Sequence, residues 1–94
     1  MAHLVRRNTG EKIELGTNPT LLGRLKAATL CLDNETVSRR HCMIKHAADG
    51  YVVVDLDSVN GTYVNGKRVK EKRLADGDVI QVGNILFVFK GEEE

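Results

Sequence analysis

Short runs of Val, Ile, Leu and aromatic residues alternate with turn signals along the whole chain. The turn signals are pairs such as Asn60-Gly61 and Asn65-Gly66, and most gaps between them hold roughly four to eight residues. Gaps of this length suit β-strands and are too short for a typical helix of about 12 residues. Eleven Val and four Ile strengthen the preference for strands. The predicted strands are His3–Arg7, Lys12–Leu15, Leu21–Gly23, Thr29–Leu32, Cys42–His46, Tyr51–Asp55, Thr62–Val64, Arg68–Val69, Val79–Val82 and Ile85–Lys90.

Two central segments indicate how these strands are buried. Alternation in Cys42–His46 predicts that Cys42 and Ile44 face the core. Residues 51–54, Tyr-Val-Val-Val, alternate too little to assign faces, which indicates a strand covered on both sides. Many short strands joined by tight turns predict an all-β fold, a two-layer antiparallel β-sandwich without significant helix.

Size and composition indicate one globular domain. The chain has 94 residues, of which 41% are hydrophobic and 29% charged. We expect a single domain over residues 1–94 with its core at about 4–90, and an acidic tail at 91–94 where a longer protein continues. The net charge is only +1, so an anion-binding site has to be local.

Membrane and disulfide signals are weak. No apolar run approaches the roughly 20 residues of a membrane span, and the first residues form no signal peptide, so no membrane partner is expected. Cys31 and Cys42 make no disulfide framework, which predicts a reducing intracellular setting, nuclear or cytoplasmic.

Arg24 follows a buried-looking strand, and Gly23 before it permits an unusual backbone angle. An Arg guanidinium can donate two parallel hydrogen bonds to a phosphate, which a Lys ammonium cannot do. Arg24 is therefore a candidate anion ligand, and an ordinary surface Arg is the alternative.

Residues 38–41, Ser-Arg-Arg-His, place a hydroxyl, two guanidinium groups and an imidazole just before a strand. Ser38 Oγ and neighbouring loop amides can donate to a phosphate. We expect His41 to be a partly buried ring that ties loop backbones together, and Arg40 to face solvent. A catalytic pair of Ser38 and His41 is the alternative, but the orienting carboxylate and oxyanion hole that it requires have no sequence signature. An enzyme is the least favoured class.

Residues 57–62, Asp-Ser-Val-Asn-Gly-Thr, form a third candidate loop. Asn60-Gly61 is a strong tight-turn signal, so a plain hairpin is one interpretation. In the functional interpretation, the Asn60 amide donates and accepts at once and pairs with a peptide backbone.

Two other patterns do not support a cofactor or a metal ion. Residues 61–67 fit most of the G-x-x-x-x-G-K phosphate loop, but Arg68 stands where Ser or Thr is required. Cys42 and His46 are four residues apart on a strand, which separates them by about 13 Å along the chain, and no other Cys or His completes a metal-binding pattern. We therefore expect neither a cofactor nor a metal.

Arg24, Ser38-x-x-His41 and Ser58-x-Asn60-Gly61-Thr62, in this order and spacing, resemble the forkhead-associated (FHA) domain. Flanking segments match it too: Leu22-Gly23-Arg24, Asp55-Leu56-Asp57-Ser58, Tyr63-Val64-Asn65-Gly66, Leu74-x-x-Gly77-Asp78-Val79-Ile80 and Gly83. The resemblance spans roughly Leu4 to Lys90. Each motif is weak by itself, but together and in register they are specific.

The resemblance implies a SMAD/FHA-like sandwich of about eleven strands whose end loops bind phosphothreonine peptides without catalysis. Carried over position by position, Arg24, Ser38 and Arg39 resemble residues that contact the phosphate. Asn60 resembles the side chain that holds the peptide main chain.

The remaining matched positions are framework or specificity positions. The framework positions are Gly23, His41, Gly61 and Thr62. The positions in loops that select the peptide are Thr36, Ser58 and Val59. The Thr36 loop helps in this family to choose the residue three after the phosphothreonine. Since the Val59 side chain cannot bond a phosphate, we expect a preference that differs from relatives with a polar residue there.

The expected partner is therefore a phosphothreonine-containing protein or peptide, bound in phosphorylation-dependent signalling of which the DNA-damage response in the nucleus is one setting. The alternative is a phosphate-independent interaction or homodimerisation domain that uses the sandwich face. Residues 67–73 carry five basic side chains and one acidic side chain, and either contact an acidic partner or, as we favour, form a solvated face that protects an edge strand. Nucleic acid is disfavoured because aromatic residues are only 4%.

Overall fold

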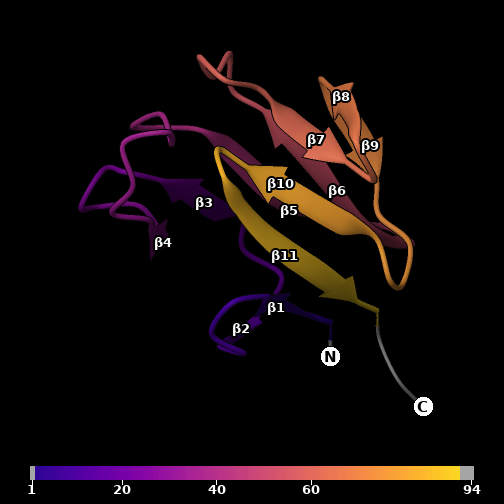
Figure 1. Ribbon diagram of the computed structural model, residues 1–94. Helices are drawn as coiled ribbons and strands as arrows, with labels where there is room; N and C mark the ends of the chain where they lie inside the picture. Colours follow the sequence, from indigo (N-terminus) through magenta and orange to yellow (C-terminus); the bar gives the residue numbers. More distant parts are fainter. Residues whose placement is uncertain (1, 92–94) are drawn as a thin grey trace.

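The computed structural model describes residues 2–91, which fold into two β-sheets packed face to face (Figure 1). The strands of the larger sheet are β1 (His3–Arg6), β2 (Lys12–Glu14), β7 (Thr62–Val64), β8 (Lys67–Val69), β10 (Val79–Val82) and β11 (Ile85–Lys90). Those of the smaller sheet are β3 (Thr20–Gly23), β4 (Leu30–Cys31), β5 (Cys42–Ala47), β6 (Gly50–Asp55) and β9 (Glu71–Arg73). The predicted all-β sandwich is confirmed.

The strand order is β2-β1-β11-β10-β7-β8 in the larger sheet and β4-β3-β5-β6-β9 in the smaller one. All strand pairs are antiparallel except β3 with β4, which is parallel. The described residues contain no helix and therefore none long and apolar enough to cross a membrane. The predicted acidic tail lies mainly at residues 92–94, outside the described residues.

One strand was absent from the sequence prediction. β9 is made of Glu71, Lys72 and Arg73, so it shows no apolar alternation, and only its pairing with β6 in the register Val53↔Lys72 defines it. β8 and β9 lie at the edges of the two sheets and contain most of the basic run at residues 67–73. The run therefore lies on edge strands, and its role in protecting them stays a prediction.

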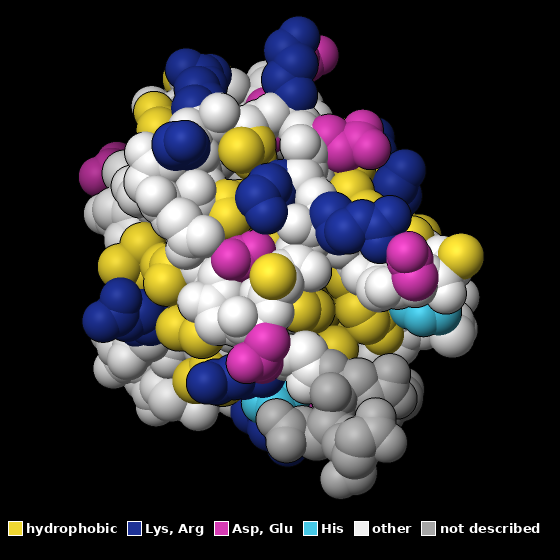
Figure 2. Space-filling model, turned by 90° about the vertical axis from the view of Figure 1, so that its right-hand side faces the viewer, with side chains coloured by type: hydrophobic (Ala, Val, Ile, Leu, Met, Phe, Trp, Pro, Cys, Tyr) yellow, Lys and Arg dark blue, Asp and Glu magenta, His cyan; other side chains and the backbone are white. Residues whose placement is uncertain are grey.

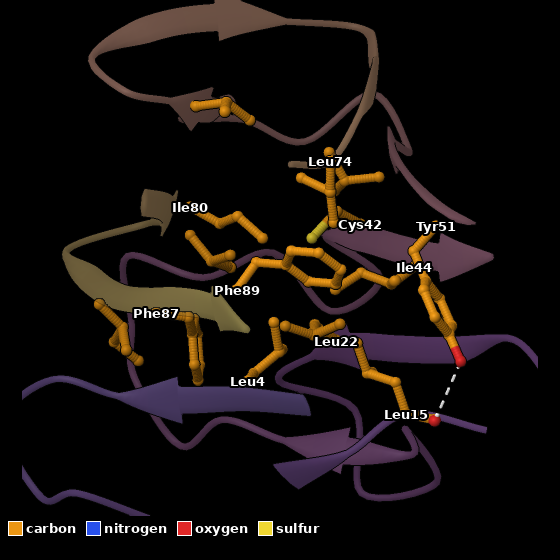
Figure 3. Close-up of a cluster of buried hydrophobic side chains, with 14 of the residues drawn as sticks. Leu4, Leu15, Leu22, Cys42, Ile44, Tyr51, Leu74, Ile80, Phe87 and Phe89 are labelled. Carbon is orange, nitrogen blue, oxygen red and sulfur yellow. Dashed lines mark hydrogen bonds between the residues drawn. The ribbon is translucent and has the colours of Figure 1, made fainter. Parts of the chain in front are cut away.

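The core lies between the sheets and takes one residue in two from each central strand (Figure 3). Leu22 and Ile44 of the smaller sheet belong to the same buried cluster as Ile80 and Phe87 of the larger one, and each is no more than 1% exposed. Burying one such side chain stabilises the fold by about 1.5–3 kcal/mol. Cys42 joins them, so the predicted inward face of β5 is confirmed.

The expectation that residues 51–54 are covered on both sides is wrong. Tyr51 and Val53 face the core, whereas Val52 and Val54 are only half-buried on the outer face of β6. Val52 lies in register between Lys45 of β5 and Arg73 of β9. The aliphatic stems of such long side chains partly cover an outward valine, so a Val here needs no second layer of protein.

The register brings several strand ends to one end of the sandwich. Cys42, at the start of β5, pairs with Leu22 near the end of β3 and with Asp55 at the end of β6. In the other sheet, Thr62 at the start of β7 pairs with Val82 at the end of β10. The loops after β3, before β5, between β6 and β7 and between β10 and β11 therefore gather at this end, on the left in Figure 1.

The opposite end, where β11 ends, is turned toward the viewer in Figure 2. Lys and Arg side chains are interspersed there with Asp and Glu, without a continuous field of one sign.

Candidate functional site

Arg24 is the first residue after β3, and the backbone continues to pair with the loop before β5. The Arg24 amide donates to Ser38 O at 3.0 Å, and the next amide donates to Arg39 O at 3.1 Å. Arg24 Nε donates to Val37 O at 3.0 Å, which fixes the orientation of the guanidinium. The side chain is exposed but anchored, so its outer N–H groups point from a defined position, unlike those of an ordinary surface Arg.

Gly23 is required for a different reason from the one predicted. Its φ is not positive, so the backbone angle does not demand glycine. A Cβ at this position would lie 2.1 Å from Arg39 O, which is a backbone atom that cannot swing away. Gly23 therefore allows the loop at residues 38–41 to approach the end of β3 closely enough for the backbone bonds of Arg24.

His41 connects the two sheets at the loop end. Its ring is fully buried rather than partly buried as predicted. Nδ1 accepts a hydrogen bond from the Ser38 amide at 3.0 Å, and Nε2 lies 2.9 Å from Gly61 O. These partners assign the tautomer with the proton on Nε2, which donates to Gly61 O. Because Nδ1 faces the Ser38 amide and not the Ser38 hydroxyl, the geometry does not support a catalytic Ser–His pair.

Ser38 presents its hydroxyl proton to the loop surface. Its Oγ accepts a hydrogen bond from the Val59 amide at 2.9 Å, so the hydroxyl remains able to donate to a ligand. The same bond ties the second predicted loop to the third. Arg39 and Arg40 are both exposed, as the solvent-facing position predicted for Arg40 requires.

The loop between β6 and β7 is organised around Asp55. The two carboxylate oxygens of Asp55 accept bonds from Ser58 Oγ at 2.6 Å, the Ser58 amide at 3.2 Å and Thr62 Oγ1 at 2.7 Å. Ser58 Oγ in turn accepts from the Gly61 amide at 3.0 Å. Ser58 was predicted as a specificity residue. Its side chain is buried inside the loop, where its hydroxyl bonds Asp55 and the Gly61 amide and so shapes the loop. Thr62 is fully buried and matches its predicted framework position.

The pKa of Asp55 records this arrangement. Burial raises the pKa of the carboxyl, but the hydrogen bonds from the Ser58 and Thr62 side chains and the Ser58 amide outweigh it, so the net pKa lies below the ordinary value of 3.8. The carboxylate is therefore ionised at neutral pH and available as an acceptor for the whole loop.

Acidification is expected to weaken the fold through Asp55. Its folded-state pKa is lowered, so the stabilisation is complete well above pH 3.8 and is lost as the pH falls through that value and below the folded pKa. Asp78 has a pKa shifted in the same direction: burial raises it, but bonds from the Ala75 amide, Asn65 and Lys72 outweigh burial. Denaturant unfolding followed from pH 7 to about pH 3 measures the slope.

The control for this pH dependence is a pair of variants. Asp55→Asn is expected to flatten the acid slope, whereas Asp33→Asn, which removes an exposed carboxylate without a hydrogen bond in the described structure, retains it. An unchanged slope in Asp55→Asn would show that this carboxyl is not responsible.

A plain hairpin at Asn60-Gly61 is excluded by the topology. β6 belongs to the smaller sheet and β7 to the larger one, so the connection crosses between sheets. The positive φ of 86° at Gly61 supports this crossing, whereas the hairpin turn is at Asn65-Gly66, where φ is 53° and 85°. The structure also excludes a phosphate loop at residues 61–67, because the strand β7 occupies the middle of this segment.

Asn60 and Thr36 join the third loop to the loop before β5. Asn60 Nδ2 donates to Thr36 O at 2.8 Å. The Thr36 hydroxyl donates to Asn34 Oδ1 and accepts from the Asn84 amide at 2.9 Å, so it is engaged between loops. Asn60 is exposed, and its Oδ1 has no hydrogen-bond partner among the residues that the structure describes.

These loops enclose a pocket of about 420 Å³. The pocket gathers most of the predicted ligand-binding residues, namely Arg24, Thr36, Ser38, Arg39, Val59 and Asn60. Val59 is 83% exposed at its rim. Glu35, Val37 and Asp57 also line it and were not predicted. Asp57 has a positive φ of 57°. An Asp tolerates this backbone angle, but the presence of an Asp does not predict it.

The described residues offer no alternative metal chemistry. They contain no group of three or more His, Cys, Asp and Glu side chains that could hold a metal ion. Burial raises the pKa of the Cys42 thiol to about 12, more than the hydrogen bond with Thr62 lowers it, so the thiol stays protonated in the core. His46, by contrast, is exposed.

Comparison with known families decides the relationship. The family model that matches is the FHA domain, over residues 20–83, which includes all three loops. The chain belongs to the FHA domain family. The matched segment begins at β3 and ends just after β10, so the strands that carry the site lie within it.

Similar proteins support this assignment. This FHA domain is 42% identical over 82 residues to the oxoglutarate dehydrogenase inhibitor of Corynebacterium jeikeium, covering 87% of this chain and 57% of the relative. It superposes with a TM-score of 0.93 on a structure from a study of phosphothreonine-dependent FHA domain interactions, at 33% identity and with 99% of this chain and 98% of the other covered. The FhaA FHA domain, solved in complex with the intracellular domain of Rv3910, gives 0.90 at 34% identity, with 96% and 100% covered. The chain spans about half the length of the curated relatives that it matches.

Proposed function

We propose that this FHA domain binds phosphothreonine-containing segments of partner proteins at its loop end and performs no catalysis. The observation that carries the proposal is the pocket that combines the anchored Arg24 guanidinium, the Ser38 hydroxyl and the Asn60 amide. Structural neighbours in the family were studied in phosphothreonine-dependent interactions and in complex with a protein domain.

The groups of the pocket suit a phosphorylated peptide chemically. A phosphate carries about −1.5 to −2 charge at pH 7 and offers three acceptor oxygens. Arg24 supplies two parallel donors, and the Ser38 hydroxyl supplies a third. Asn60 then pairs with the peptide main chain beside the phosphothreonine, using the Oδ1 that the loops leave exposed. Val59 offers only apolar surface, so it contacts the peptide without adding a phosphate bond.

In the whole protein, such a domain serves a regulatory role through binding. One relative is named as an enzyme inhibitor, which fits a protein that acts by association. The relatives named above are bacterial, so an intracellular, cytoplasmic setting is the one that they support. The nuclear setting and the DNA-damage role find no support among them.

Matched peptides test the proposal. A peptide selected from a degenerate phosphothreonine library is synthesised with phosphothreonine and with unmodified threonine, and its binding is measured by titration calorimetry. Hydrogen bonds to charged groups contribute about 1.5–3 kcal/mol each, so two of them favour the phosphorylated form by at least about 100-fold. Equal affinity for the two forms would overturn the proposal.

Phosphate-independent dimerisation through the sandwich face has less support. Val59 is the one large hydrophobic side chain that is exposed among residues 2–91, and it lies at the rim of the peptide pocket rather than on a sheet face. Light scattering after gel filtration tests this alternative, for which a dimer that forms without any peptide is the required result.

A further inference from the structure

A second polar hollow lies at the loop end, away from the pocket of Arg24. It has a volume of about 170 Å³. Two guanidinium groups and three side-chain amides line it, from Arg6, Arg7, Asn8, Asn34 and Asn84, and no lining residue is acidic. Nothing in the proposed phosphate pocket uses these side chains.

Arg6 and Arg7 are two basic residues whose charge is not balanced by a neighbouring carboxylate in the described part of the chain. Arg73 pairs with Asp49 and Lys72 pairs with Asp78, but neither Arg6 nor Arg7 forms an ion pair within residues 2–91. Arg6 Nε is buried and has no hydrogen-bond partner among the described residues. Buried donors are almost always paired, so a ligand oxygen that accepted a hydrogen bond from this N–H would be favoured. Arg7 is exposed and can reach the same anion from the surface.

The register places these arginines beside the peptide site. β1 pairs antiparallel with β11 up to Arg6↔Phe87, and the Arg7 amide donates to Leu86 O at 3.0 Å. The end of β1 is therefore next to the turn between β10 and β11, which contains Asn84. Asn34 Nδ2 donates to Asn84 Oδ1 at 2.7 Å, which links that turn to the loop carrying Thr36.

Shared lining residues connect the hollow to the phosphate pocket. Between the two lies a third hollow of about 410 Å³. It shares Thr36 and Asn60 with the phosphate pocket and Asn84 with the hollow of Arg6 and Arg7. An extended peptide advances about 3.3 Å per residue, so a chain whose phosphothreonine contacts Arg24 can follow this surface to Arg7.

We propose that Arg6 and Arg7 form an anion subsite for an acidic side chain or a second phosphate of the same bound peptide. The subsite rests on the proposed function, because the phosphothreonine fixes the peptide in register. Two carboxylate or phosphate oxygens suit the paired N–H groups of a guanidinium, and the amides of Asn8 and Asn84 are further polar neighbours. The domain then reads a spacing between two anions as well as the phosphothreonine itself.

An acid scan tests the subsite. The parent peptide carries one phosphothreonine among neutral residues, and each member of the series has one Asp moved along the chain, so all members have the same net charge. Wild-type domain is expected to bind members with the Asp in one narrow window about tenfold more tightly than the parent, and phosphoserine in that window more tightly still. A flat scan with both residues would overturn the subsite.

Variants identify the residues responsible. Arg7→Ala, at an exposed position, and Arg6→Gln are expected to abolish the tenfold increment while affinity for the parent stays within about twofold. Lys45→Ala removes the same charge from an exposed position on β5 and is expected to retain the increment. Equal loss in Lys45→Ala and Arg7→Ala would attribute the increment to general charge and overturn the assignment. Failure of wild-type domain to bind even the parent would instead overturn the proposed function, and the subsite with it.

Discussion

Arg24→Ala is expected to weaken binding of a phosphothreonine peptide by about 30- to 150-fold. In the proposed function the guanidinium makes charge-assisted hydrogen bonds to the phosphate, and losing them removes about 2–3 kcal/mol of binding free energy. The effect is large because Arg24 Nε is held by Val37 O, so the donors are positioned before the peptide arrives. Titration calorimetry with the matched peptide pair measures the loss.

Two companion variants separate position from charge. Arg40→Ala removes an exposed guanidinium two residues from Ser38 that does not line the pocket, and it is expected to leave affinity within about twofold. Arg24→Lys retains the charge but not the paired N–H groups, and an intermediate affinity is expected. Wild-type affinity in Arg24→Ala would remove this residue from its proposed role. Because Arg24 is exposed, its loss is expected to leave the thermal midpoint nearly unchanged.

The strands could be predicted where side chains alternate and could not where charge replaces that alternation. Cys42 and Ile44 predicted the buried face of β5. β9 consists of three charged residues, and its strand conformation depends on pairing with residues 52–54 of β6. The partial burial of the outer face of β6 could not be predicted either, because the side chains that cover it come from neighbouring strands. Alternation along a strand shows which side chains face the core. It does not show how far side chains of the neighbouring strands cover the outer face.

The residue types of the site could be predicted, but their roles depend on contacts across the chain. Ser38 and Asn60 are both recognisable as polar loop residues, yet the bond from the Val59 amide that leaves the Ser38 proton free cannot be read from sequence. Gly23 looked like a backbone-angle glycine and instead makes room for Arg39 O. Arg6 gave no motif at all, because its signal is the absence of a partner in a folded environment.

The network of Asp55, Ser58, His41 and Gly61 explains why the framework positions matter for binding. Ser58 and Thr62 shape the third loop on the Asp55 carboxylate, and His41 fixes Gly61 to the loop of Ser38. The two loops that would contact the peptide are thus held to each other by the buried bonds of His41 as well as by the exposed bonds of the Val59 amide and Asn60. Such a site needs little rearrangement on binding, which favours affinity.

His41→Ala is expected to lower the free energy of unfolding by about 3 kcal/mol. The substitution empties a fully buried site and leaves the Ser38 amide and Gly61 O without their partner, each a loss of about 1–3 kcal/mol. For a domain of this size, about 3 kcal/mol lowers the midpoint of thermal unfolding by roughly 12–24 °C. Denaturant unfolding and thermal denaturation followed by circular dichroism measure both quantities.

His46→Ala is the matched control, because it removes an exposed histidine whose ring packs on Tyr51 at 5.0 Å between centroids. Loss of that contact is expected to change the free energy of unfolding by no more than about 1 kcal/mol. Binding measured at a temperature where His41→Ala remains folded tests the second role of the ring. If His41 holds the loops in position, affinity falls there too, whereas wild-type affinity in the folded variant would limit the residue to stabilising the fold. A variant as stable as wild type would contradict both roles, since nothing else among the described residues bonds the Ser38 amide or joins its loop to Gly61 O.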